Sequence, residues 1–107
     1  MEKVKKISAD IADKLFDLAS EELYKKGPSY EQDGDRVSNF KNQAARLGLE
    51  PFQIWAVYFG KHIDAINNAI KRSPSFPHDE SEGFESRLID AAAYLALGYE
   101  LYQEAKK

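Results

Sequence analysis

The chain has 107 residues, of which 43% are hydrophobic and 31% are charged, and its formal net charge is -3. These values predict one globular domain over residues 1–107 rather than a disordered chain. The net negative charge argues against duplex nucleic acid as a partner, because such binding needs a basic face. The absence of cysteine excludes disulfides and thiol nucleophiles.

No apolar run approaches the roughly 18 residues that a membrane span needs. The N-terminal residues Met1–Lys6 are not followed by the apolar core of a signal peptide. We therefore expect a cytoplasmic protein with no membrane partner.

The first predicted helix runs from about Glu2 to Lys26, because its apolar residues recur at steps of three and four. Its main apolar stripe is Val4, Ile7, Ile11, Leu15 and Leu18. Gly27-Pro28 is expected to end this helix, and a loop should follow as far as Gly34.

The second predicted helix is short. Asp35 is a suitable N-cap for it, and Gly48 is expected to close it. Its apolar face is predicted to consist of Val37, Phe40, Ala44 and Leu47.

The third predicted helix spans about Pro51 to Arg72 and is apolar over a wide arc. Its main stripe is Phe52, Ala56, Phe59, Ile63, Ile66 and Ile70. A second stripe beside it is Ile54, Tyr58 and His62. Such a helix is either central in a bundle or part of a subunit interface.

The last predicted helix begins near Asp79 and Glu82, which have capping-box spacing, and runs to about Glu104. Its main stripe is Phe84, Leu88, Ala91, Leu95, Gly98 and Tyr102, and a second one is Asp90, Tyr94, Leu97 and Leu101. The expected fold is an all-α bundle of about four helices, three long and one short. It is expected to be oligomeric through the third and fourth helices.

Several carboxylates are candidate ligands for Mg²⁺, which prefers oxygen donors. Glu82 and Glu85 share a helical face, Asp90 heads an apolar stripe, and Asp35 follows a loop. Other roles stay open, because Asp35 can cap a helix and Asp90 can pair with Arg87. The acids on the first helix, Asp10, Asp13, Asp17 and Glu21, are better explained as a solvated face with nearby lysines.

Lys61 and His62 lie in the middle of the third helix. A lysine there can reach a phosphate as a point charge, and a histidine can act as acid or base. The plainer alternatives are a surface lysine and a half-buried histidine bonded to a neighbour. No serine hydrolase elbow, Walker A motif or dinucleotide glycine pattern is present.

Residues 27–104 resemble the small phage-encoded proteins related to the MazG-like group of all-α nucleoside triphosphate pyrophosphohydrolases. The resemblance lies in an Asp-Arg-x-x-Asn-Phe-Lys segment at 35–41, in Lys61-His62, and in Arg-Leu-Ile-Asp-Ala-Ala-Ala-Tyr-Leu at 87–95. It implies a single MazG-like domain that forms a homo-oligomer, either a dimer or a tetramer. It also implies Mg²⁺-dependent cleavage of a nucleoside triphosphate to the monophosphate and pyrophosphate.

Under this resemblance, Lys61 and His62 are the candidate catalytic residues, and Lys41, Lys61, Arg87 and Tyr94 the candidate nucleotide ligands. Glu82, Glu85, Asp90 and Asp35 are the candidate metal ligands. The chain departs from the family pattern because Glu85 and Asp90 are five residues apart rather than three, and because Ala93 stands where phage relatives have asparagine. Hydrolysis is therefore left open.

Two alternatives stay beside this reading. One is a protein that binds a nucleotide without cleaving it and sequesters it against a host defence. The other is a helical oligomer that contacts proteins through an aromatic surface, with Trp55, Phe59, Tyr94, Tyr99 and Tyr102 as candidates.

Overall fold

The computed structural model describes residues 2–30, 35–78 and 83–106, with side chains at 9–25, 35–78 and 83–106. In these parts of the chain it contains four α-helices and no strand: α1 (Glu2–Tyr30), α2 (Ser38–Leu47), α3 (Pro51–Arg72) and α4 (Phe84–Lys106). The expectation of an all-α fold with three long helices and one short helix is confirmed.

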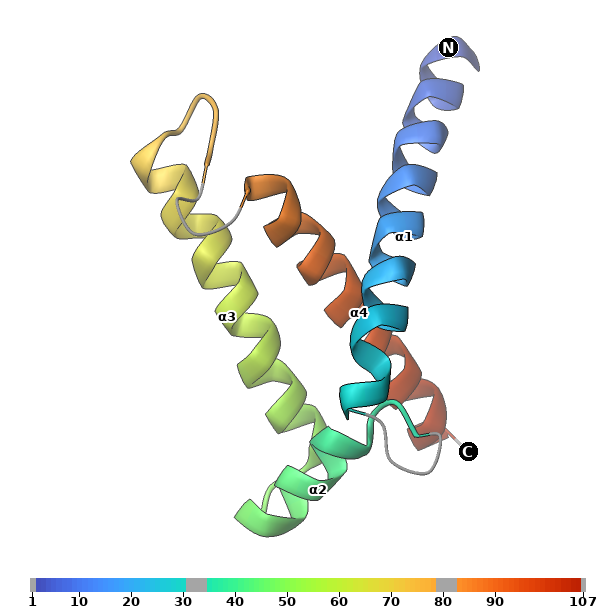
Figure 1. Cartoon of the computed structure of the whole chain (residues 1–107), viewed down its shortest axis with the longest axis vertical. Helices are drawn as coiled ribbons and strands as arrows, with labels where there is room; N and C mark the ends of the chain where they lie inside the picture. Colours follow the sequence, from blue (N-terminus) through green and yellow to red (C-terminus); the bar gives the residue numbers. More distant parts are fainter. Residues whose placement is uncertain (1, 31–34, 79–82, 107) are drawn as a thin grey trace.

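The helices form an open arrangement (Figure 1). α4 packs against both α3 and α1, and α2 packs against α3. The N-terminal half of α1 leads away from α3, so the two helices form a V that opens toward the N-terminus (Figure 1). The principal extents of 45 × 34 × 23 Å reflect this shape.

The turn between α2 and α3 follows the sequence prediction. Gly48 adopts a left-handed conformation, with φ of 70°, and ends α2. Glu50 is the N-cap of α3, and its backbone N–H donates to Oε1 of Gln53 at 2.8 Å. Pro51 follows in the first turn, where its missing N–H leaves no helical bond unmade.

The predicted end of the first helix is wrong, because α1 continues past Gly27-Pro28 to Tyr30. Proline has a helical φ and removes only one hydrogen-bond donor. A residue before proline normally avoids the helical region because its Cβ clashes with the proline ring. Glycine has no Cβ, so this sequence permits a final helical turn.

The predicted start of the second helix is also wrong, because Val37 rather than Asp35 is the N-cap. Asp35 instead closes a turn before the helix, where its Oδ1 accepts the N–H of Val37 at 3.0 Å. Aspartate forms such turns with the backbone two residues later. The predicted start of the last helix at Asp79 and Glu82 lies outside the described residues.

The core lies where α2, the first half of α3 and the second half of α4 meet. Its buried members are Val37, Phe40, Ala44, Ile54 and Leu101, and Trp55, Tyr58, Tyr94 and Leu97 pack against them. The rings of Phe40 and Tyr58 lie 6.2 Å apart, and those of Phe40 and Tyr94 lie 6.4 Å apart, both tilted. These are favourable aromatic geometries. The Phe40 ring of α2 therefore contacts both α3, through Tyr58, and α4, through Tyr94.

α3 and α4 approach most closely at Trp55. The indole Nε1 donates to the backbone carbonyl of Tyr94 at 2.7 Å. That carbonyl points along α4 toward the residue four positions later, Gly98, so the indole must pass over Gly98 to reach it. A Cβ built on Gly98 would lie 2.6 Å from indole carbons of Trp55, closer than any real contact. The absent side chain therefore sets the distance between the two helices.

The two helices do not bury the stripes that seemed dominant in the sequence. On α3 the core side is Ile54, Tyr58, His62 and Ala69, while on α4 it is Ala93, Tyr94, Leu97 and Leu101. The main predicted stripes lie largely outside, with Ile63 36% exposed and Leu95 55% exposed. A helix that is apolar on two sides can bury only the side that its own neighbours cover.

The close approach at Gly98 gives a direct test. Gly98→Ala should lower the free energy of unfolding by about 1–3 kcal/mol, because the new methyl group overpacks the contact with Trp55. Gly60→Ala is the matched control, since a Cβ there meets nothing within 4 Å. It should raise the stability by about 0.5–1 kcal/mol through helix propensity. Urea denaturation followed by circular dichroism measures both, and equal effects of the two substitutions would contradict the packing argument.

Candidate functional site

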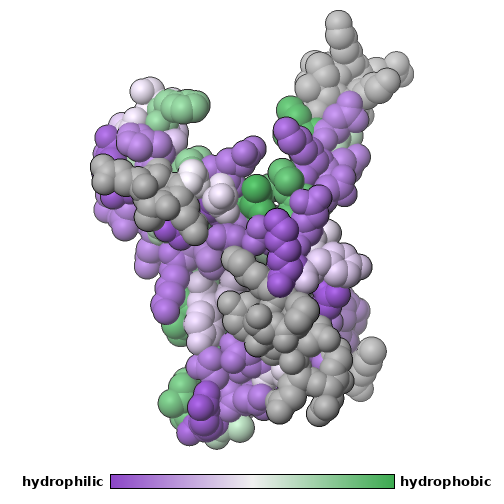
Figure 2. Space-filling model, in the orientation of Figure 1, coloured by the Kyte–Doolittle hydropathy of each residue, from purple (hydrophilic) through white to green (hydrophobic). Residues whose placement is uncertain are grey.

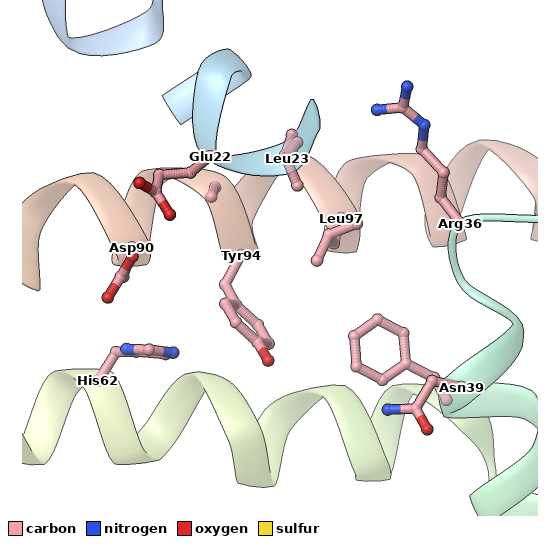
Figure 3. Close-up of a pocket in the computed structure, with 10 residues that line it drawn as sticks. Glu22, Leu23, Arg36, Asn39, His62, Asp90, Tyr94 and Leu97 are labelled. Carbon is pink, nitrogen blue, oxygen red and sulfur yellow. The ribbon is translucent and has the colours of Figure 1, made fainter. Parts of the chain in front are cut away.

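A cleft opens between α1, α2, α3 and α4 on the side of α4 that faces α1 (Figure 3). Its volume is about 190 Å³, many times the roughly 10–15 Å³ that one water needs. The lining residues are Glu22, Leu23, Arg36, Asn39, Phe40, His62, Asp90, Ala93, Tyr94 and Leu97. Four separate segments of the chain therefore contribute to one concave site.

One end of the cleft is acidic. Glu22 from α1 and Asp90 from α4 extend their carboxylates toward the same end, and His62 from α3 lies below them (Figure 3). The His62 ring is tilted against Tyr94, with 4.7 Å between ring centroids, and its Nδ1 is buried. Two acids and a histidine from three helices give this end side chains that can accept or donate a proton.

The other end of the cleft is aromatic and apolar. Leu97 and Leu23 lie at this end, and the Tyr94 ring separates it from the acidic end (Figure 3). Phe40 also lines the cleft, with its ring centroid 6.4 Å from that of Tyr94. Asn39 supplies an amide there. Such a mixture of flat apolar surface and a few polar groups is typical of small-molecule sites.

Hydrogen bonds from residues outside the cleft hold the polar groups at this end. Nε2 of Gln43 donates to the hydroxyl of Tyr58 at 2.7 Å and to Oδ1 of Asn39 at 3.3 Å. Asn39 is thus held through its oxygen. The bond from Trp55 to the Tyr94 carbonyl fixes the backbone that carries the Tyr94 ring.

Arg36 supplies the positive charge among the residues that line the cleft. Its guanidinium carbon lies 5.3 Å from the ring centroid of Tyr24 on α1, a cation–π distance. In Figure 3 the side chain stands at the rim, away from His62. Arg36 can therefore reach a ligand that projects from the cleft without leaving its aromatic support.

The structure brings together three of the residues predicted from the sequence: His62, Asp90 and Tyr94 line the same cleft. Lys61 is the next residue along α3 from His62 but does not line it. Its side chain is exposed, with Nζ 5.3 Å from the ring centroid of Tyr58. Arg87 is half-buried on α4 and is likewise not part of the lining.

The four predicted metal ligands are not gathered in one place. Asp35 belongs to an ion-pair cluster at the far end of α4, described below. Glu85 is exposed near the start of α4, where it lines a separate groove together with Ile11, Lys14, Leu15, Leu18, Leu88 and Ile89. Glu82 lies outside the described residues. Within the described ranges, no three acidic, histidine or cysteine side chains form a metal-binding group.

Lys41, a predicted nucleotide ligand, is held by two carboxylates. Its Nζ lies 2.8 Å from Oδ2 of Asp35 and 2.9 Å from Oε1 of Glu104. Glu104 is 14 residues beyond Asp90, or about 21 Å along the helix axis. This cluster fastens the turn before α2 to the end of α4, and it is separate from the acidic end of the cleft.

The titration of this cluster follows from its contacts. The hydrogen bond from Lys41 lowers the pKa of the Asp35 carboxyl, against the raising effect of desolvation, and the Val37 N–H lowers it further. The hydrogen bonds to Asp35 and then Glu104 raise the pKa of Lys41. Each charge therefore favours the ionised form of its partner.

Sequence reasoning did not identify Glu22, Arg36 or Asn39 as site residues. The spacing of Glu22 could have identified it as a site residue, because it lies four residues after Leu18 and seven after Leu15. It therefore continues an apolar stripe of α1, where a carboxylate is costly unless it has a role. Arg36 and Asn39 stand in the Asp-Arg-x-x-Asn-Phe-Lys segment at 35–41, but that pattern assigned them no role. Arg36 precedes α2 and Asn39 lies in its first turn, and only tertiary packing orients this short helix.

Comparison of the chain with protein-family models, with curated proteins and with solved structures finds no match. Among the described residues, no helix is both long enough and apolar enough to cross a membrane. The geometry of the cleft is thus the main basis for a functional proposal.

The ion-pair cluster predicts a pH dependence of stability. Because the folded-state pKa of Asp35 is lowered, its stabilisation is present above the ordinary value of 3.8 and is lost as the pH falls through the folded-state value. The folded-state pKa of Lys41 is raised, so the stability that this lysine contributes is present below its ordinary pKa of 10.5. It is lost as the pH rises through the folded-state pKa.

Asp35→Asn removes the charge and keeps an oxygen that can accept the Val37 N–H. At about pH 6 it should lower the free energy of unfolding by about 0.5–1 kcal/mol, since the pair is partly exposed. At a pH below the lowered folded-state pKa the difference from the wild type should shrink toward zero, because the wild-type carboxyl is then protonated in the folded protein as well. Urea denaturation at the two pH values measures it, and a difference that does not change with pH would contradict the assignment.

Proposed function

We propose that the protein binds a nucleoside triphosphate, or a related phosphate ester, in this cleft and hydrolyses it with Mg²⁺ to the monophosphate and pyrophosphate. The observation that carries the proposal is the convergence of Glu22, His62 and Asp90 from three helices at one end of an aromatic cleft. The proposal agrees with the resemblance of the sequence to the MazG-like group.

The donor set fits Mg²⁺ only together with a phosphate ligand. Mg²⁺ commonly uses one or two carboxylates, completes its octahedron with phosphate oxygens and water, and neutralises phosphate charge. Glu22 and Asp90 are the two carboxylates that would hold it. Without the metal, these acids would repel a phosphate, so we expect binding to depend on Mg²⁺.

The remaining residues have roles that suit a nucleotide. Phe40 and Tyr94 offer aromatic surface for a base, since base–aromatic stacking contributes about 1–3 kcal/mol per base. Asn39, held by Gln43, can donate from its amide nitrogen to a base or sugar oxygen. Arg36 at the rim can pair with a phosphate that extends out of the cleft.

His62 is the residue best placed to accept a proton. Hydrolysis joins a water oxygen to the α-phosphorus, breaks the bond from that phosphorus to the bridging oxygen and releases pyrophosphate. The proton lost by water needs a base, and a histidine beside two carboxylates is suited to this task. Tyr94 limits the rotation of the imidazole by ring contact.

Binding without hydrolysis is the second candidate function. It is favoured by the small number of acids, because the cleft contains two carboxylates and the described residues contain no three-ligand metal group. A protein of this kind would sequester a nucleotide, for example one used as a host defence signal. Lys41 and Lys61 lie outside the cleft in either case.

The cytoplasm is the compartment consistent with this proposal, because nucleoside triphosphates and Mg²⁺ are present there together. For a phage-encoded chain it is the cytoplasm of the host. A homo-oligomer is part of the same proposal, since the outward apolar side chains of α3 and α4 need cover.

The proposal is tested with a panel of nucleoside triphosphates, with and without Mg²⁺, by isothermal calorimetry and pyrophosphate release. We expect Mg²⁺-dependent binding that Glu22→Gln and Asp90→Asn each weaken at least about tenfold, or about 1.4 kcal/mol. Glu21→Gln and Asp64→Asn are matched controls, because both acids are exposed and neither lines the cleft. Binding of no member of the panel would reject the nucleotide site.

His62→Gln separates the two candidate functions. If the protein is an enzyme, this variant should retain nucleotide affinity within a few-fold and lose about 100-fold or more in turnover, the usual contribution of a general base. If the wild type binds a nucleotide but releases no pyrophosphate, the binding-only function stands instead. An unchanged turnover in His62→Gln would remove this residue from the mechanism.

A further inference from the structure

We propose that Gln43, acting through Asn39, selects the base of the nucleotide. The cleft takes bases that carry a carbonyl oxygen on the edge remote from the sugar, and it rejects bases that carry an amino group there. Uracil, thymine, guanine and hypoxanthine belong to the first class, and cytosine and adenine belong to the second. This inference rests on the proposed nucleotide site and names the class of base that the site takes.

The amide protons of Gln43 are both committed to oxygen atoms. Its Nε2 donates to the Tyr58 hydroxyl at 2.7 Å and to Oδ1 of Asn39 at 3.3 Å. An amide nitrogen can meet Asn39 in this way only if Asn39 turns its oxygen toward it. In Figure 3 the oxygen of Asn39 lies on the side away from Tyr94, and the nitrogen lies on the side of Tyr94. Asn39 therefore presents its N–H donors to the cleft.

This orientation is set before a ligand arrives. Gln43 and Asn39 are four residues apart on α2, where side chains are neighbours. Tyr58 anchors the pair on α3, because its half-buried ring packs 6.2 Å from the core ring of Phe40. A group that is already oriented in the free protein loses little conformational freedom when the ligand binds. Gln43 is thus a positioning residue for Asn39.

The polar side chains at the aromatic end of the cleft are donors. Arginine has N–H donors and no acceptor, which applies to Arg36, and Asn39 has its oxygen bonded to Gln43. The Tyr94 hydroxyl can donate or accept, so it does not discriminate. The other residues that line this end have apolar side chains: Leu23, Phe40 and Leu97. A ligand that brings an acceptor to Asn39 is therefore matched there, and one that brings a donor is not.

The aromatic end is also the place that suits a base. The near surface of the molecule is mostly hydrophilic, and its apolar groups gather in the notch between α1 and the other helices (Figure 2). A flat base is poorly matched to a hydrophilic surface, whereas Phe40 and Tyr94 offer it ring faces inside the cleft.

The acidic end determines which way the nucleotide lies. Mg²⁺ held by Glu22 and Asp90 would keep the phosphates at that end, so the base extends past Tyr94 toward Asn39. The group that distinguishes uracil from cytosine, and hypoxanthine from adenine, lies on the base edge remote from the sugar. That group is the one that comes to Asn39.

An oxygen at this position accepts the Asn39 N–H. An amino group instead brings two donors face to face and leaves both without an acceptor, which is unfavourable once water is excluded. A site built to hydrogen-bond one ligand group rejects the analogue that lacks it more strongly than an apolar pocket does. The selection therefore comes from the mismatched ligand as much as from the matched one.

The test is isothermal calorimetry of the full chain with Mg²⁺ and two matched pairs of ligands, UTP with CTP and ITP with ATP. The Kd of CTP should be at least about tenfold that of UTP, and the Kd of ATP at least about tenfold that of ITP. Equal affinities within each pair, or a preference for CTP and ATP, overturn the base selection and leave the proposed function standing. Binding of none of the four rejects the proposed function and the selection together.

Two variants should shift the preference toward the amino bases. In Asn39→Asp one carboxylate oxygen still accepts the Gln43 N–H, and the other offers the base an acceptor. In Gln43→Glu the new carboxylate has no N–H to donate, so Asn39 turns its nitrogen toward it and its oxygen toward the base. Each variant should lower the ratio of the CTP and UTP Kd values by at least about tenfold. The ratio cancels the repulsion that a new negative charge exerts on both ligands.

Asn42→Asp is the matched control, because Asn42 is an exposed asparagine of the same helix that does not line the cleft. It adds the same charge and should leave the ratio at the wild-type value. Circular dichroism checks the fold of all three variants. A wild-type ratio in both Asn39→Asp and Gln43→Glu overturns the proposal, and so does an equal shift in the control. A purely structural role of Gln43 would weaken UTP and CTP alike and leave their ratio unchanged.

Discussion

The contact of Trp55 with Gly98 and with the Tyr94 carbonyl is the constraint on which the rest of the structure depends. It fixes the spacing of α3 and α4, because the indole occupies the space that any side chain at position 98 would fill. The hydrogen bond to the Tyr94 carbonyl sets how the indole lies across α4. Phe40 then packs against Tyr58 and Tyr94, so α2 is positioned by the same pair of helices.

The candidate site follows from this arrangement. Tyr94 carries the aromatic ring of the cleft, and its backbone is held by Trp55. Four residues earlier on α4, Asp90 faces the acidic end, where α1 contributes Glu22 and α3 contributes His62. Since no single helix supplies more than one of these three groups, the site exists only when the helices are packed. A weakened contact at Gly98 is therefore expected to affect the cleft as well as stability.

Two faces of α4 have different uses in this view. One faces α1 and forms the cleft, and the other, with Leu95 and Tyr102, is left exposed by the parts of the chain that the structure describes. A chain of 107 residues can build only a small core.

The sequence by itself determined the number and order of the helices, the turn at Gly48 and the bounds of α3, because periodicity, caps and proline positions are local properties. Only the tertiary structure decided which of two apolar stripes faces inward, that Asp35 pairs with Lys41, and that Glu22 joins His62 and Asp90. The physical reason is that a helical period gives the angles between side chains on one helix but does not say which side of that helix faces the core. The side that faces the core was set by the approach of Trp55 to a glycine 43 residues away.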